Sequence, residues 1–517
     1  VMWASPFLAP RIADCAYDGQ LLSKGLLLTT EIEMNRLLLE SGDDKAIQTF
    51  NEIKRQRTLL DQQVALPKEQ RNSDADSLRQ VINRLERQLT AMSTTYGDYT
   101  RPLRTTWQQV RDRLAPDDVA IEFVFFYPQR EDSLQIPYLG ALVLKHDMPH
   151  PEMRLLCDDW QLRVISTDGC YSSDSLSNLI WKPLAQYLEG AKRVYFSPAG
   201  ALHDLAVEYA PVKDNKTFSE CYDTYRLSST REIVTSSPSK RMESARLFGG
   251  LQYNAKMEEV GAANRDEGLN VDASMMANRA PVDSLLLRGG AGYLAYTLKE
   301  VEDIGRQLKG KIDDVRTLVG VQGTEEAFKN LSGHPADILH VATHGFFWTD
   351  EQVGRMANLS FLQVANSETS SAEDKALSRS GLLFAGANAA LTRKPIPDNM
   401  EDGVLTAREL AQMDLRGTSL VVLSACQTAL GTVTGEGVFG LQRGFKKAGV
   451  KTIVMSLWKV DDQATQVLMS AFYRHLAEGQ SMRQAFTEAQ SHLRQVENGR
   501  FNEPLYWAAF ILLDAVE

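Results

Sequence analysis

The chain has 517 residues, of which 43% are hydrophobic and 24% are charged, values typical of a globular protein that is too long for a single core. Its formal net charge of −11 argues against broad binding to nucleic acids or to anionic membrane surfaces. The acidic balance favours a basic substrate, although ordinary solubility explains it more simply. No apolar run approaches the roughly 18 residues that a membrane-spanning helix needs, so we expect no membrane segment.

The cysteines are spread widely along the chain and form no CxxC pair: Cys15, Cys157, Cys170, Cys221 and Cys426. An odd number at such spacing argues against a disulfide framework and against a zinc site, so we predict neither a metal nor another cofactor. Reduced thiols predict a cytoplasmic location. The chain begins with Val1 instead of methionine, which predicts a fragment or a processed form.

Residues 1–115 are predicted to form a helical region. Asp43 and Asp44 are suited to cap a helix whose apolar residues follow helical spacing. A second helix is expected around residues 81–89, and the polar stretch 62–76 is expected to separate the two. We interpret this region as a connector that packs on the rest of the chain without a catalytic role.

Residues 116–275 change to strand-like patterns with helical segments between them, which predicts an α/β region. Apolar runs at 119–126 and 138–144 flank a polar loop and predict a hairpin. We identify no catalytic set in this region, and the polar pair His203–Asp204 is expected to be structural.

Residues 276–517 alternate between strand and helix patterns, which predicts a largely parallel sheet covered by helices on both faces. Strands are expected at 315–319, 337–343, 420–423, 451–458 and 506–513. The polar stretches 254–292 and 350–377 are expected to be a linker and an exposed loop. Residues 431–437 are expected to form a glycine-rich loop.

Two of the expected strands end in residues that carry chemistry. One is followed by small residues and Cys426, and the other by His344 and Gly345. Parallel strands bring their carboxyl ends to one edge of a sheet, so neighbouring strands would place a thiol beside an imidazole. An imidazole favours the nucleophilic thiolate that a cysteine peptidase needs. The backbone N–H groups of Gly345 and Cys426 are the predicted donors to the oxyanion.

Simpler explanations exist for both side chains. A cysteine in a buried strand is often only a small apolar residue. His340 and His344 form an H-x-x-x-H pattern, but a zinc peptidase places such a pair on a helix with a glutamate after the first histidine. Here Val341 follows His340 in a strand-like segment. We therefore expect His340 to be a buried, hydrogen-bonded neighbour of the site and not a metal ligand.

Two carboxylates follow the strand expected at 451–458. Asp462 either caps the next helix or lies at the base of a pocket for an Arg or Lys side chain, and Asp461 beside it allows both roles to be filled. Trp458 either forms a wall of that pocket or belongs to the core. These three residues are the predicted substrate-binding set.

Seven motifs then follow one another along the chain: H-V-A-T-H-G-F-F (340–347), S-R-S-G-L-L-F-A-G-A-N (378–388), D-G-V-L-T-A-R-E-L (402–410), V-V-L-S-A-C-Q-T-A-L-G (421–431), G-E-G-V-F-G-L (435–441), S-L-W-K-V-D-D (456–462) and P-L-Y-W-A-A-F (504–510). In this order they resemble the CHAT-domain cysteine proteases, relatives of caspases and separase that are often attached to tetratricopeptide repeats. The resemblance covers roughly residues 175–517.

The resemblance implies a caspase/separase-like α/β fold, with a mostly parallel sheet sandwiched by helices. It implies an active caspase-like half at 276–517, a pseudo-caspase-like half at 116–275 and a helical connector at 1–115. It also implies a cysteine endopeptidase with a His344–Cys426 dyad that cleaves proteins after a basic P1 residue. Asp462 falls where separase-like sequences carry the aspartate that meets a P1 arginine.

A regulated setting is implied as well. CHAT proteases often serve in prokaryotic antiviral defence or cell death, where an activating protein or an RNA-guided complex switches them on. We therefore expect a protein substrate and a protein activator, with no direct contact to nucleic acid or membrane. The alternatives are a protein-binding scaffold whose protease site is silent in isolation and, third, a zinc hydrolase.

Overall fold

The computed structural model describes residues 9–24, 43–65, 75–92, 105–126, 137–165, 167–213, 216–236, 240–269, 290–348, 376–392, 394–397, 399–425, 431–434 and 437–516. Cys426 lies outside the described residues, as do the expected loop from 350 through 375 and much of the expected linker. His344, Gly345, Trp458, Asp461 and Asp462 are all described.

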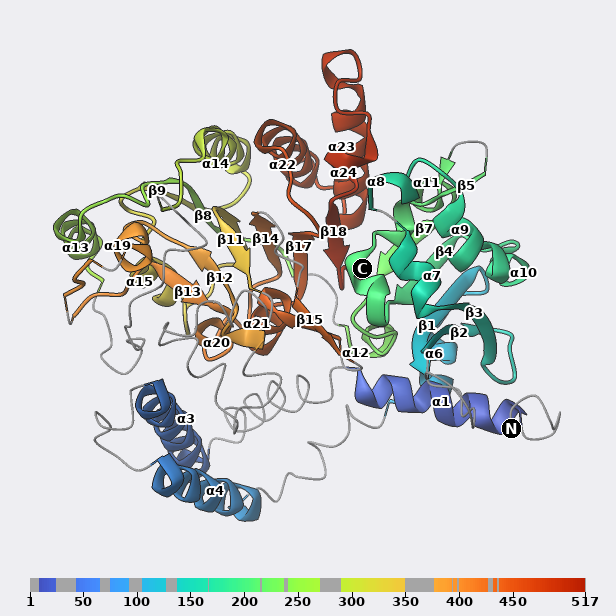
Figure 1. The fold of residues 1–517 in the computed structure, drawn as a ribbon, viewed down its shortest axis with the longest axis horizontal. Helices are drawn as coiled ribbons and strands as arrows, with labels where there is room; N and C mark the ends of the chain where they lie inside the picture. Colours follow the sequence, from blue (N-terminus) through green and yellow to red (C-terminus); the bar gives the residue numbers. More distant parts are fainter. Residues whose placement is uncertain are drawn as a thin grey trace.

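One large sheet organises the described residues (Figure 1). Its strand order is β3-β2-β1-β4-β7-β18-β17-β14-β10-β8-β9. The strands are β1 (Asp118–Phe126), β2 (Tyr138–Lys145), β3 (Glu152–Asp158), β4 (Arg193–Ser197), β7 (Asp223–Arg226), β8 (Ser244–Leu251), β9 (Asp314–Gly320), β10 (Ile338–Ala342), β14 (Leu420–Ser424), β17 (Thr452–Ser456) and β18 (Phe510–Leu513).

The antiparallel pairing of β17 with β18 separates two groups of parallel strands in this sheet, and β2 and β3 extend it beyond β1 by antiparallel pairing. Strands β17, β14, β10, β8 and β9 run in one direction, and β18, β7, β4 and β1 run in the other. The mostly parallel sheet that the sequence predicts is therefore confirmed. The carboxyl ends of the two groups lie at opposite edges of the sheet.

Strand β8 precedes residue 275, the predicted limit between the halves, yet it pairs with β10 and β9. We propose that the second half begins with this strand, near residue 240.

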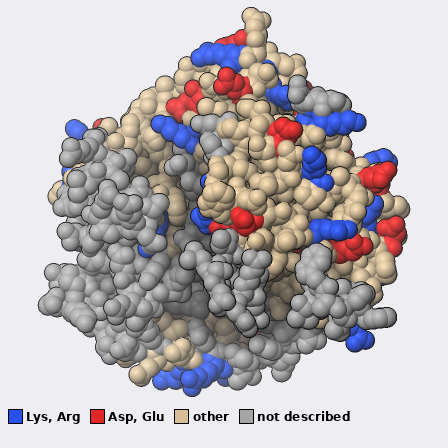
Figure 2. All heavy atoms as spheres, turned by 45° about the vertical axis from the view of Figure 1, so that its right-hand side comes forward, with Lys and Arg blue, Asp and Glu red and all other residues tan. Residues whose placement is uncertain are grey.

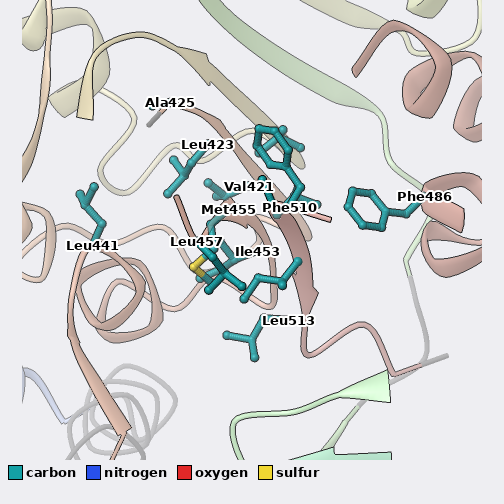
Figure 3. Packing of buried hydrophobic residues seen from close by; sticks show 14 of the residues in the cluster. Val421, Leu423, Ala425, Leu441, Ile453, Met455, Leu457, Phe486, Phe510 and Leu513 are labelled. Atoms are coloured by element: carbon teal, nitrogen blue, oxygen red, sulfur yellow. The ribbon is translucent and has the colours of Figure 1, made fainter. Parts of the chain in front are cut away.

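Continuous apolar runs account for the centre of the sheet. Every residue of β14 and of β17 is buried, as expected for parallel strands covered on both faces. Figure 3 shows Val421 and Leu423 of β14 beside Ile453 and Met455 of β17, with Phe510 of β18 among them. One cluster of buried apolar side chains runs through both halves, so the halves share a core.

Helices cover both faces of the second half. Figure 1 shows α14 and α22 above these strands and α20 and α21 below them. The helices of this half are α13 (Met257–Asp266), α14 (Ala295–Leu308), α15 (Glu325–Lys329), α19 (Asn388–Leu391), α20 (Ala407–Leu410), α21 (Leu441–Lys447), α22 (Asp462–Ala477), α23 (Met482–Gln495), η6 (Val496–Asn498) and α24 (Pro504–Trp507). Small residues permit the close packing: a Cβ atom at Gly444 of α21 would lie 2.7 Å from the Ala407 carbonyl oxygen of α20.

The first half also combines strands of the large sheet with short helices, and β1 and β2 form the predicted antiparallel hairpin. Its shorter elements are α7 (Asp159–Val164), α8 (Thr167–Cys170), α9 (Ser175–Ile180), η3 (Lys182–Leu184), α10 (Ala185–Leu188), η4 (Gly200–Asp204), η5 (Val207–Tyr209), β5 (Pro211–Lys213), β6 (Lys216–Thr217), α11 (Phe218–Cys221) and α12 (Glu232–Thr235). His203 lies buried in η4, and its carbonyl oxygen accepts a hydrogen bond from Arg226, which suits the structural role expected for it.

The described residues before the first strand form the helices α1 (Ala9–Ser23), α3 (Asp44–Ala65), α4 (Ala75–Met92) and α6 (Trp107–Arg113). Asp43 caps α3, because its side chain accepts hydrogen bonds from the Lys45 and Ala46 N–H groups. Helix α1 is joined to the first half by Lys24, whose Nζ atom lies 2.7 Å from Glu122 Oε2 inside the protein. Among the described residues, no helix combines the length and the apolar character needed to cross a membrane.

Three local expectations are wrong. Most of the expected glycine-rich loop is strand: β15 (Gly431–Thr434) and β16 (Gly437–Gly440) pair as antiparallel neighbours, because threonine and valine favour strands around the glycines. The expected linker contains α13, whose acidic first turn suits a helix start. The strand expected at 506–513 is shorter, since Pro504 begins the helical turn α24 before β18.

Candidate active site

The predicted histidine lies just beyond the end of β10. Strands β10 and β14 are parallel neighbours, and Ala342 is the register partner of Ser424 at their carboxyl ends. His344 follows Ala342 by two positions, and Cys426 follows Ser424 by two positions in the sequence. Cys426 itself is outside the described residues.

The ring of His344 is held from two sides. Its Nε2 atom lies 2.7 Å from the carbonyl oxygen of Gly292. A carbonyl oxygen only accepts, so Nε2 carries the proton and donates, which leaves Nδ1 as the basic nitrogen of the neutral ring. The ring of Tyr253 packs against the imidazole at 5.0 Å between centroids.

Tyr253 comes from the segment after β8 and is buried. Its hydroxyl group lies 2.9 Å from Thr343 Oγ1, directly before the histidine. Burial raises the pKa of Tyr253 to about 12, although the hydrogen bonds of its hydroxyl group with Thr343 and with the His344 backbone act to lower it. The phenol therefore stays neutral near neutral pH and acts as an uncharged wall.

Gly345 begins β11 (Gly345–Phe347), which pairs with β12 (Ser380–Leu383), and β12 pairs in turn with β13 (Val404–Thr406). Gly345 lies opposite Leu382, and the Leu383 N–H donates to the His344 carbonyl oxygen at 3.0 Å. This bond makes Gly345 and Leu382 a non-hydrogen-bonded pair, so the Gly345 N–H points away from β12.

The two aspartates after β17 have different surroundings. Asp461 caps α22, because its Oδ1 atom accepts the Ala464 N–H at 2.9 Å. Asp462 is the first residue of that helix and does not serve as the cap. Burial raises the pKa of Asp462, the charge of Asp461 raises it further, and the nearby His344 opposes this rise. Asp462 is thus electrostatically coupled to the histidine.

Trp458 is half-buried between the two halves of the chain. Its Nε1 atom donates to the Leu505 carbonyl oxygen at 3.0 Å. Its ring lies 5.5 Å from that of Tyr171, a residue of the first half. Of its two predicted roles, the packing role is visible in these contacts, and the pocket role stays a prediction.

The sequence matches the CHAT domain over residues 172–515, which is more than half of the chain. The chain belongs to the CHAT family. This confirms the resemblance found in the seven motifs.

Other comparisons of this CHAT chain cover smaller parts or are distant. Tetratricopeptide repeat protein 28 of Mus musculus is 37% identical over 112 residues, and that of Homo sapiens is 33% identical over 115 residues. The matched parts are 21% and 22% of this chain but only 4% of each relative.

Among solved structures, the Arg-specific cysteine proteinase gingipain R is similar at 8% identity and a TM-score of 0.37, with 65% of this chain and 68% of that chain covered. The Saccharomyces cerevisiae separase–securin complex is similar at 10% identity and a TM-score of 0.33, covering 91% of this chain and 27% of that chain.

The first histidine of the H-V-A-T-H-G-F-F motif, His340, has the surroundings expected for it. His340 is buried, and its Nε2 atom lies 2.8 Å from Glu300 Oε1 of α14. Tyr473 of α22 packs across the same imidazole at 5.4 Å. The prediction of a buried, hydrogen-bonded His340 is therefore confirmed.

A group of three carboxylates near α15 has the spacing of a metal site: Glu325, Glu401 and Glu409. A cation from the protein lies among them, because Lys329 Nζ is 2.7, 3.1 and 2.9 Å from the three carboxylates in that order. The lysine fills the role that a metal would have.

Sequence reasoning missed three residues that shape the CHAT site: Tyr253, Gly292 and Glu300. Gly292 contributes a backbone carbonyl group, which leaves no mark in the sequence. Glu300 is one of several acidic residues in its part of the sequence, and its role follows from the packing of α14 on β10. Tyr253 follows the strand-like run 246–250, and an aromatic residue after a strand end is too common to be diagnostic.

Proposed function

We propose that the chain is a cysteine endopeptidase that uses His344 and Cys426 as a dyad. The observation that carries the proposal is the register of Ala342 with Ser424, because it gives the two residues matching positions beyond neighbouring parallel strands. The hydrogen bond from His344 Nε2 to Gly292 supports it further, since Nδ1 is then left to accept the thiol proton.

In the proposed reaction, the Cys426 thiolate attacks the scissile carbonyl carbon and the carbonyl oxygen becomes an oxyanion. The N–H groups of Gly345 and Cys426 stabilise that charge. The C–N bond then breaks as the imidazolium gives its Nδ1 proton to the leaving amine, which leaves an acyl-enzyme. Water, deprotonated by the same nitrogen, attacks the thioester and releases the acid and the thiolate.

We propose that Asp462 binds a P1 arginine or lysine. It is half-buried, it is not the cap of α22, and it interacts electrostatically with His344, so it is close enough to the reacting centre for a side chain of one substrate to reach both. Asp461 adds negative charge beside it. Trp458 is proposed as the apolar wall, because its side chain is only half-buried.

The cellular role is proposed to be regulated proteolysis in the cytoplasm, in a prokaryotic defence or cell-death pathway. A protein activator or an RNA-guided complex is proposed to contact the chain through protein surfaces. Figure 2 shows Lys and Arg interspersed with Asp and Glu over the described part of one face, which does not favour direct binding to a nucleic acid there.

The test is a fluorogenic peptide panel that varies P1, read with wild type and with Cys426→Ala. Turnover after Arg or Lys that needs Cys426 would support both the dyad and the acidic pocket. Turnover after another residue would keep the dyad and remove Asp462 as the P1 reader. Turnover that persists in Cys426→Ala would refute the dyad. No turnover by wild type would favour the alternative, a scaffold whose site is silent without its activator.

A further inference from the structure

Asn388 is hydrogen-bonded to residues that lie beside His344. It is the first residue of α19, is only 4% exposed, and ends the motif at 378–388. Asn388 has no role in the reaction proposed above. Its contacts, however, lead to both groups that hold the His344 ring.

The side chain of Asn388 forms two hydrogen bonds with the backbone of Ala291. Its Oδ1 atom accepts the Ala291 N–H at 2.6 Å, and its Nδ2 atom donates to the Ala291 carbonyl oxygen at 3.0 Å. The second Nδ2 hydrogen is directed to Asn254 Oδ1 at 2.8 Å. Only a primary amide supplies one acceptor and two donors in this arrangement.

The residue that follows Ala291 is Gly292, the acceptor for His344. The peptide bond between Ala291 and Gly292 is planar, so fixing the Ala291 carbonyl group also fixes the Gly292 N–H and Cα atoms. This limits where the Gly292 carbonyl group can lie. On the other side, Gly290 has a φ of +77°, and a Cβ atom there would lie 2.7 Å from the Asn388 amide. The absence of a side chain at Gly290 thus lets the Asn388 amide approach the backbone closely.

The backbone of Asn388 makes the second connection. Its N–H donates to the Tyr253 carbonyl oxygen at 3.0 Å. Tyr253 is the residue whose ring packs on the imidazole of His344. One buried asparagine is therefore bonded to Tyr253 and to Ala291, the residue before Gly292.

We propose that Asn388 is a positioning residue that fixes the tautomer and orientation of His344 through Ala291 and Gly292. The inference rests on the proposed dyad. Without the amide, the Gly292 carbonyl group is no longer held, the Nε2 proton loses its fixed acceptor, and the imidazolium that accompanies the thiolate is less stabilised. Misplacement on the order of 1 Å at such a site costs about 100-fold in rate, so we expect a loss of about 10- to 100-fold in kcat with little change in KM.

The experiment is the pH dependence of Cys426 alkylation by iodoacetamide, followed by mass spectrometry on the full chain, because it needs no substrate. Wild type should alkylate at pH values below the usual thiol range, about 8.5. The variant His344→Ala gives the pH profile for alkylation of Cys426 without its imidazole partner. We expect Asn388→Ala to move the profile toward that of His344→Ala, with a rate at pH 7 about 10-fold below wild type.

Gln490→Ala is the matched control, because Gln490 is also a buried amide and donates to the Trp507 carbonyl oxygen at 3.0 Å, away from the site. Its profile should equal that of wild type. Gly290→Ala is the second test variant: it keeps Asn388 but crowds the amide, and it should reproduce the shift if Asn388→Ala does not fold.

Wild-type profiles in the folded variants Asn388→Ala or Gly290→Ala would overturn the positioning role and leave the dyad intact. A wild-type profile that already equals that of His344→Ala would instead remove the dyad, and the inference with it.

Discussion

Ala342 and Ser424 are register partners at the carboxyl ends of two neighbouring parallel strands, β10 and β14. Each is followed two positions later by one member of the proposed dyad, His344 or Cys426. Parallel strands with this register end at one edge of the sheet, which is where α/β proteins place their sites. The same strands are buried throughout, so the scaffold beneath the site is rigid.

The first prediction concerns that dyad. Cys426→Ala and His344→Ala should each abolish peptide cleavage, because one removes the nucleophile and the other removes the base that activates it. We expect losses of about 1000-fold or more in kcat/KM, with unchanged melting temperatures. Cys221→Ala is the control, since Cys221 is an exposed cysteine of α11, in the first half of the chain. Equal losses in the control would point to a general effect on the protein.

The second prediction separates reactive from buried thiols. Burial, helped by the charges of Asp158 and Asp159, raises the pKa of Cys157 to about 12. At pH 7.5 that thiol is almost entirely protonated, so iodoacetamide should leave Cys157 unmodified in the native chain while Cys426 reacts. Peptide mapping before and after unfolding measures this. Cys157 labelling in the folded protein at the rate of Cys426 would contradict it.

The third prediction is a pH effect on P1 selectivity. A carboxyl group with a raised pKa takes up its proton at a higher pH than usual, so the preference for arginine should fall as the pH is lowered, earlier than for an ordinary aspartate. The measurement is the ratio of kcat/KM for P1 arginine to that for its neutral isostere citrulline. In Asp462→Asn this ratio should be about 10- to 100-fold lower and independent of pH.

Asp461→Asn is the matched control for that experiment. Asparagine also caps helices well, so α22 should keep its stability. Because the Asp461 charge raises the pKa of Asp462, its removal should preserve the arginine preference to lower pH. A pH-independent ratio in wild type would exclude Asp462 as the P1 reader.

The sequence predicted those parts of the molecule that rest on local patterns. The apolar runs predicted β10 and β14, and the H-V-A-T-H-G-F-F motif predicted His344 as the candidate base. Contacts between distant backbone atoms could not be predicted: Gly292 serves through a carbonyl group that every residue has, and the Asn388 amide meets Ala291 only after the chain has folded. Two adjacent aspartates also could not be told apart, because only geometry shows that Asp461 is the cap.

The fourth prediction concerns the attachment of α1 to the first half. Lys24 is 4% exposed, and its Nζ atom contacts Glu122, the Phe123 carbonyl oxygen and both oxygens of Ser197. Removing one partner of a buried ion pair costs about 3–5 kcal/mol, because the other charge remains buried. Lys24→Met should therefore increase hydrogen exchange in α1 and lower the melting temperature. Arg11→Gln, on the exposed side of the same helix, should change neither.

The fifth prediction concerns the cluster around Lys329. Burial raises the pKa of Glu401 to about 7, with Lys329 opposing the rise and Glu409 adding to it. A carboxyl group whose pKa is higher in the folded chain than in the unfolded chain binds a proton on folding. Raising the pH from about 4.5 to 7 therefore lowers the free energy of unfolding, by up to about 3 kcal/mol at about 1.4 kcal/mol per pKa unit.

Glu401→Gln tests this cluster, because the amide cannot ionise. Its stability relative to wild type should rise with pH across that window and then level off above pH 7. Denaturant unfolding at several pH values gives the difference directly, and other titrating groups cancel between the two proteins. Glu497→Gln, an exposed glutamate paired with Arg500, should show no such trend. A constant difference between Glu401→Gln and wild type would mean that Glu401 is ionised throughout, with Lys329 compensating its charge fully.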